Sequence, residues 1–234
     1  MTIRTERVQI PVADGTTMDG YLCRPEGDGP RPAILILQEI FGVNAHIRDV
    51  AERFAREGYV TLAPDLFHRT TPGYEGNYAD FAPSLKLAGQ YKGEQSEADV
   101  RAAADYLAKH PAVAEARVAA LGFCMGGRLS FVTNGVAPLK CAVSFYGSIA
   151  PDKLSYAATQ AGPILLIWAG KDPFIPQEAA QSTVDALRKH GKPFVNIEFS
   201  EHDHGFFCDA RSNYNAAAAS QAWALTLAFL KSHL

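Results

Sequence analysis

The sequence predicts an α/β fold with a mostly parallel central sheet of about eight strands and helices on both faces. Short apolar runs alternate along the chain with amphipathic stretches of helical period, the pattern of strands joined by crossover helices. Several of these runs, such as "AILILQ", are continuous and rich in branched side chains, which is typical of strands buried on both faces. A chain of 234 residues can build one sizeable core, so we expect a single domain over residues 1–234.

The elements follow in chain order. Two runs on either side of the turn "ADGTT" predict an opening hairpin of residues 7–12 and 18–24. Further strands are expected at residues 33–38, 59–65, 117–123, 140–147, 163–170 and 193–200. Helices are expected at residues 47–58, 96–110, from 125 onward, at 177–191 and at 215–234. Ser96 is the expected N-cap of the second helix.

One long stretch lacks a clear period. Residues 69–90 are rich in Gly, Pro and Tyr and are expected to be irregular. A long loop in a compact domain is often a lid or a binding loop.

Composition and charge exclude several classes of function. The net charge is −3 and no basic block is present, so we expect no nucleic-acid partner. No apolar run is long enough for a transmembrane helix, and the N-terminus lacks the apolar region of a signal peptide, so we expect no membrane association. The four cysteines show neither C-x-x-C pairs nor zinc spacing, which favours reduced thiols in a cytoplasmic protein. The oligomeric state is left open.

The stretch "GFCMGG" places Cys124 between a predicted strand and a predicted helix. This is the G-x-S-x-G arrangement with cysteine as the candidate nucleophile, on a turn where Gly122 and Gly126 allow strand and helix backbones to approach closely. The helix N-terminus favours a thiolate, and the N–H of Met125 is placed to donate to an oxyanion. The alternative is a buried, inert cysteine in a glycine-rich turn.

Two polar residues after later strands could complete a triad. Asp172 follows the strand at 163–170, and His204 follows the strand at 193–200. Carboxyl ends of parallel strands form the sites of open α/β sheets, and the chain order nucleophile, acid, base is the expected one. Asp172 could instead be a turn residue and His204 a surface histidine, and His202 is a rival base. We prefer His204 because it directly precedes Gly-Phe.

These residues lie in stretches that resemble the dienelactone hydrolase family of α/β-hydrolases. The matching stretches are "QEIFGVNAHIRDVAERFAREGYVTLAPDLF", "GFCMGGRLSF", "WAGKDPFIP" and "HDHGF". The resemblance implies a triad of Cys124 as nucleophile, His204 as base and then acid, and Asp172 as the residue that orients it. It also implies that Glu39 contacts the resting thiol and that the backbone N–H of Ile40 joins that of Met125 in the oxyanion hole. Glu39 could instead be a structural carboxylate near the end of the sheet.

The implied reaction is hydrolysis of a small lactone or ester, of the dienelactone type, through a thioester intermediate, with no metal ion or organic cofactor. Two alternatives are kept. One is a broad carboxylesterase or thioesterase acting on neutral small esters. The other is a catalytically silent member of the fold that binds a small molecule or a partner.

The sequence departs from the family pattern at one position. Family members that act on dienelactone carry an arginine four residues after the catalytic histidine to hold the substrate carboxylate, and here that position is Cys208. The candidate replacements are Arg69, Lys86, Arg128 and Arg211.

Overall fold

The computed structural model describes residues 1–27, 29–91 and 93–234. It divides into two compact units, Met1–Val118 and Ala119–Leu234. The described residues form eight strands, most of them parallel and flanked by helices, which confirms the predicted α/β class. The expectation of one domain over the whole chain stays a prediction.

The strands of the first unit begin with the predicted hairpin. Their bounds are β1 (Ile3–Pro11), β2 (Thr17–Pro25), β3 (Arg31–Leu37) and β4 (Val60–Pro64). Their order is β1-β2-β4-β3, with β2 antiparallel to both of its neighbours and β3 parallel to β4. Every residue of β4 is buried, as predicted for a strand covered on both faces.

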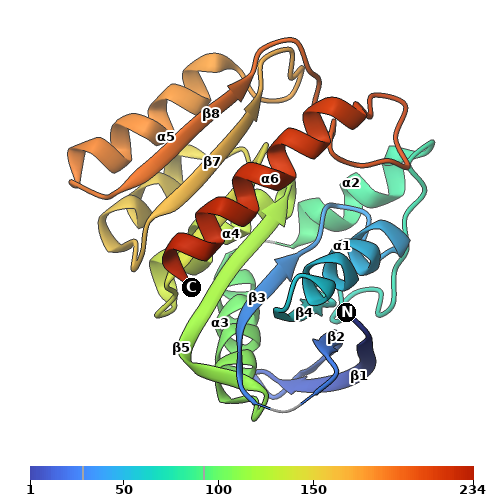
Figure 1. Cartoon of the computed structure of the whole chain (residues 1–234). Helices are drawn as coiled ribbons and strands as arrows, with labels where there is room; N and C mark the ends of the chain where they lie inside the picture. The colour runs from blue at the N-terminus through green and yellow to red at the C-terminus, as the bar shows by residue number, and fades with distance from the viewer. Residues whose placement is uncertain (28, 92) are drawn as a thin grey trace. The chain divides into compact units, whose positions relative to one another are not determined.

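Helices cover both faces of these strands. The three helices are α1 (Ala45–Arg56), α2 (Phe81–Gln90) and α3 (Glu94–Lys109). α1 begins at Asn44, whose side chain accepts a hydrogen bond from the N–H of Ile47 at 3.1 Å, and it buries Val50 and Phe54. Figure 1 shows α1 in front of β3 and β4, and α3 behind them. No helix among the described residues is long and apolar enough to cross a membrane.

Two expectations for this unit were wrong. Residues 69–90 are not irregular throughout, because α2 occupies their last ten positions. The signal was present in the sequence: Asp80 caps the helix by accepting from the N–H of Ala82, and Pro83 stands in the first turn, where its missing N–H costs nothing. Ser96 is not an N-cap, since α3 is capped by Gly93 and Ser96 Oγ donates to the Gly93 carbonyl.

The second unit is a fully parallel arrangement. β5 (Val113–Phe123), which starts in the first unit, is followed by β6 (Cys141–Phe145), β7 (Ile164–Ala169) and β8 (Phe194–Phe199), in the spatial order β5-β6-β7-β8. The helical segments are α4 (Met125–Val136), the 3₁₀ segment η1 (Pro151–Thr159), α5 (Gln177–Lys189) and α6 (Ala216–His233). η1 was not predicted.

Parallel strands in this unit bring three loops to one edge. The carboxyl ends of β5, β7 and β8 lead into Cys124, Asp172 and His204, respectively. Figure 1 shows α6 crossing in front of β5. Open α/β sheets form their sites at the carboxyl ends of the strands, where these three residues lie.

Candidate active site

Cys124 stands at the turn between β5 and α4, as predicted from the motif. Its backbone has φ 55° and ψ −115°, a conformation that L-residues rarely adopt, and it occupies the N-cap position of α4. The turn is tight: a Cβ atom on Gly122 would lie 2.1 Å from the Gly126 carbonyl oxygen, so no other residue fits there. Met125 is the first residue of α4, and N–H groups of a first turn have no partner within the helix.

Asp172 and His204 form a buried pair. Asp172 Oδ2 lies 2.7 Å from His204 Nδ1, and their side chains are only 1% and 6% exposed. The other carboxylate oxygen, Oδ1, accepts from the backbone N–H groups of Phe174 at 2.8 Å and Ile175 at 3.2 Å. Because both oxygens are engaged, the carboxylate is fixed and in turn fixes the imidazole.

The surroundings of His204 change its protonation. Burial lowers the pKa of the imidazole, but hydrogen bonds to Asp172 and to the Cys124 side chain, together with their negative charges, outweigh burial and raise the pKa from 6.5 to about 10. Nδ1 faces Asp172, which leaves Nε2 for the thiol. The imidazole is therefore stabilised in its protonated form next to Cys124.

Two aromatic rings contact the imidazole of His204. The ring of Tyr146, which is fully buried, lies 4.8 Å away, and the ring of Phe174 lies 5.3 Å away and edge-on at 86°. His202, the rival base, packs instead against Phe199 and Phe206. Neither ring contact of His204 was foreseen from the sequence.

Glu39 and Ile40 lie in the first unit, just after β3, and both are buried. Tyr78 donates a hydrogen bond from its hydroxyl to Glu39 Oε2 at 3.0 Å, and Asn44 Nδ2 donates to the same hydroxyl oxygen at 2.9 Å. Asn44, which caps α1, thus also binds the hydroxyl of Tyr78, and that hydroxyl binds Glu39. The contact of Glu39 with the thiol and the oxyanion role of Ile40 stay predictions.

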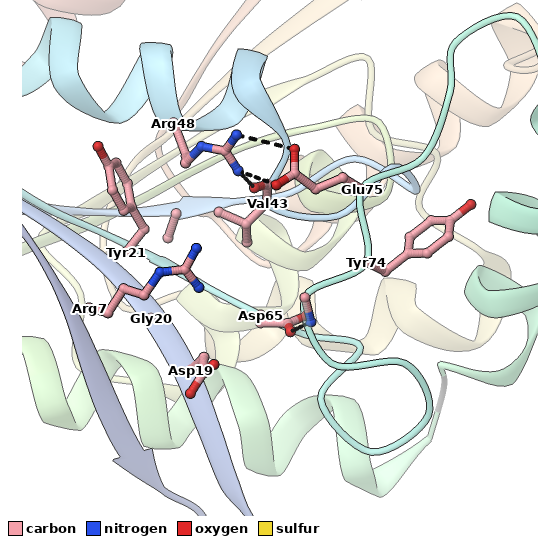
Figure 2. A pocket seen from close by; sticks show the side chains of 11 residues that line it. Arg7, Asp19, Gly20, Tyr21, Val43, Arg48, Asp65, Tyr74 and Glu75 are labelled. Carbon is pink, nitrogen blue, oxygen red and sulfur yellow. Dashed lines mark hydrogen bonds and ion pairs between the residues drawn. The ribbon is translucent and has the colours of Figure 1, made fainter.

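The segment that carries Tyr78 is fastened at two points around a small pocket of about 50 Å³. Figure 2 shows the guanidinium of Arg48 donating to Glu75, at 2.7 and 3.1 Å, and to the Val43 carbonyl. On the other side of the pocket, Asp65 Oδ2 accepts from the N–H of Gly73 at 2.6 Å. These contacts hold the segment in place before it reaches Tyr78.

The four basic candidates have different surroundings. Arg69 is bound at 2.6 Å to both Asp14 and the fully buried Asp99, so its guanidinium is committed to the first unit's own structure. Lys86 is exposed on α2, and Arg128 is half-buried in the first turns of α4. Arg211 lies close to the triad.

The position of Arg211 follows from its contact with Gly205, the residue after His204. Gly205 has φ +82°, and a Cβ atom on it would lie 2.5 Å from Arg211 Nη1. Cys208, at the position of the family's arginine, is fully buried. The guanidinium of Arg211 thus packs against the loop that carries His204.

Comparison with known proteins places this site in a family. The sequence model described as "Dienelactone hydrolase family" matches residues 18–234. The chain belongs to the dienelactone hydrolase family. It is therefore a hydrolase of ester or lactone bonds.

Individual relatives agree with that membership. A "Putative carboxymethylenebutenolidase" of Synechocystis is 35% identical over 94% of both chains, and a protein of the same name from Escherichia coli K12 is 34% identical over 94% of this chain and 84% of its own. A crystal structure titled "Putative Dienelactone Hydrolase" from Klebsiella pneumoniae superposes with a TM-score of 0.88 at 31% identity, covering 99% of each chain.

Sequence reasoning missed three contributors to the site of this dienelactone hydrolase family member. Phe174 and Tyr146 contact the imidazole, and the Asn213 side chain donates a hydrogen bond to the His204 carbonyl. Phe174 had a signal, since it is an aromatic residue two positions after a candidate catalytic Asp. Tyr146 had a weaker one, because it directly follows an apolar strand, as many core residues do.

Proposed function

We propose that the protein hydrolyses a small lactone or ester through a Cys124–His204–Asp172 triad and a thioester acyl-enzyme. The observation that carries the proposal is the buried 2.7 Å contact between Asp172 and His204. The Cys124 side chain is among the groups that raise the pKa of that imidazole. A nucleophile, a base and a group that orients the base are the three parts that such chemistry needs.

The first half of the reaction forms the thioester. His204 Nε2 takes the proton of the Cys124 thiol, and the sulfur attacks the carbonyl carbon, whose π electrons move to the oxygen. When this oxyanion collapses, the bond to the alkoxy oxygen breaks, and the Nε2 proton passes to that oxygen. The raised pKa of His204 favours the imidazolium that holds this proton until it is needed.

The second half returns the enzyme to its starting state. Nε2 removes a proton from water, and the resulting hydroxide attacks the thioester carbonyl. The bond to sulfur then breaks to release the carboxylic acid, and the Nε2 proton returns to the sulfur of Cys124. The N–H of Met125, at the start of α4, supports the oxyanion in both steps. The family resemblance assigns the second N–H to Ile40 and assigns activation of the resting thiol to Glu39.

The identity of the substrate is a separate question. Cys208 is buried and uncharged, so it is unsuited to bind a substrate carboxylate. The guanidinium of Arg211, beside Gly205, has the charge and geometry to bind one. We therefore propose Arg211, whose guanidinium lies beside the histidine loop, as the residue that takes over this task.

Variants of the triad test the mechanism with p-nitrophenyl acetate as substrate. Cys124→Ala is expected to lower kcat by at least about 10³-fold, since triad members act as one unit. Acid quenching of the wild type during turnover should leave an acetyl group on Cys124, detected by peptide mass.

The two histidines supply a matched control. His204→Ala should match the loss in Cys124→Ala, and His202→Ala should stay within about tenfold of wild type. Near-normal turnover by Cys124→Ala would overturn the proposal and would favour a silent binding protein or another nucleophile.

A further inference from the structure

Phe174 is a large apolar side chain that faces solvent beside the triad. Phe174 is 63% exposed, yet the centroid of its ring lies 5.3 Å from that of the His204 imidazole in an edge-on contact. Tyr146, the other ring on His204, is fully buried. Packing of the core thus explains why an aromatic residue stands at Tyr146, but it does not explain the exposed ring of Phe174.

The backbone of Phe174 is held by the triad itself. Its N–H donates to Asp172 Oδ1 at 2.8 Å, and the same carboxylate binds His204 through Oδ2. This bond holds the backbone of Phe174 beside the imidazole, and the edge-on contact with His204 orients the ring. A side chain that is already ordered loses little entropy when a ligand covers it, so it is well suited to binding.

The chemistry of the triad says which part of a substrate lies nearest. His204 must come within hydrogen-bonding reach of the alkoxy oxygen that it protonates. The group attached to that oxygen therefore passes beside the imidazole, and Phe174 is the exposed apolar surface there. Burying such a surface against an apolar group is favourable, and two aromatic rings gain further from edge-to-face contact.

We infer that Phe174 is a specificity-determining residue that contacts the alcohol side of the substrate and selects esters and lactones whose alkoxy part is aromatic or planar and unsaturated. This inference rests on the proposed triad. It places the apolar group of the substrate on the side of the leaving oxygen and specifies nothing about the acyl group.

Two isomeric esters separate the two sides. Benzyl acetate carries its phenyl ring on the alcohol side, and methyl phenylacetate carries it on the acyl side. Hydrolysis of both is followed by pH-stat titration for the wild type, Phe174→Ala and Phe174→Tyr. Leu225→Ala is the matched control, because it removes an apolar side chain that is 42% exposed on α6 and contributes nothing to the triad.

Phe174→Ala should lower kcat/KM for benzyl acetate about tenfold, the scale of one lost aromatic contact, and that for methyl phenylacetate by less than about twofold. Phe174→Tyr keeps the ring and should keep kcat/KM for both esters close to that of the wild type. Leu225→Ala should change neither ester.

Two results would overturn the inference. One is an equal loss on both esters in Phe174→Ala, accompanied by a shifted pH–rate profile, which would make the ring a support for the imidazole only. The other is no change on either ester. Cys124→Ala, measured in parallel, should abolish hydrolysis of both esters. If it does not, the proposed triad fails rather than the role of Phe174.

Discussion

Replacing Asp172 by Asn tests the central pair with almost no change of shape. The amide oxygen can still accept from the N–H groups of Phe174 and Ile175, as Oδ1 does now. The amide nitrogen then faces His204 Nδ1 and can only donate to it. Nδ1 must accept, so the ring proton moves to Nε2, and a neutral imidazole in that form cannot take the thiol proton.

The expected loss of kcat is about 10³- to 10⁴-fold, the scale seen when the same exchange is made in a serine-protease triad. A second effect appears in stability. The pKa of His204 is raised to about 10 in the folded protein, against 6.5 for an ordinary histidine. Its contribution to the free energy of unfolding is therefore complete below pH 6.5 and is lost as the pH rises towards 10, by about 1.4 kcal/mol per unit.

Urea unfolding at pH 7 and pH 8.5 measures this contribution. The wild type should lose about 2 kcal/mol over that interval. Asp172→Asn should lose less, because it removes the Asp172 charge that helps to raise the pKa of His204, while the contribution of Cys124 remains. The window ends below pH 9 because burial raises the pKa of the Cys23 and Cys141 thiols to about 12, and their effect on stability begins above the ordinary thiol pKa of 9. Equal slopes in the two proteins, or turnover of Asp172→Asn within tenfold of wild type, would refute the reasoning.

Three further predictions concern single residues. Brief treatment with iodoacetamide should alkylate Cys124 before Cys141, which is fully buried and has a pKa raised to about 12 by burial; peptide mapping that shows the reverse order would contradict this. Tyr78→Phe removes the hydrogen bond to Glu39 and should lower kcat up to about tenfold with KM unchanged, and a change in KM alone would argue against a positioning role. Arg211→Gln should lower kcat/KM for an anionic dienelactone by about tenfold or more while sparing its methyl ester; equal effects on both would show that no carboxylate is held there.

Much of the fold could be predicted because its pattern is local. Most of the strands contain a short apolar run, and the five helices with a clear period were all found. α2 and η1 were missed, since they are short segments whose caps and prolines carry more signal than their hydrophobic period. Parallel strand order then places Cys124, Asp172 and His204 at one edge of the second unit.

The finer parts of the site could not be predicted in the same way. One oxygen of Asp172 binds backbone N–H groups and the other binds His204. This arrangement depends on the path of the loop after β7, which a pattern of residue types does not specify. The contacts of Phe174 and Tyr146 with His204 depend on rotamers and on side chains from three separate loops. The link from Tyr78 to Glu39 joins residues 39 positions apart through a segment with no regular period.

The backbone of Cys124 limits how this enzyme can evolve. With φ at 55° and ψ at −115°, the turn already holds a strained residue, a cost on the order of 1–3 kcal/mol. Cysteine and serine have a single heavy atom beyond Cβ and can share that conformation, so thiol and hydroxyl chemistry are one substitution apart at this position. Threonine is β-branched and would clash there. Descendants of this protein can thus exchange cysteine for serine at this position, but the turn excludes threonine.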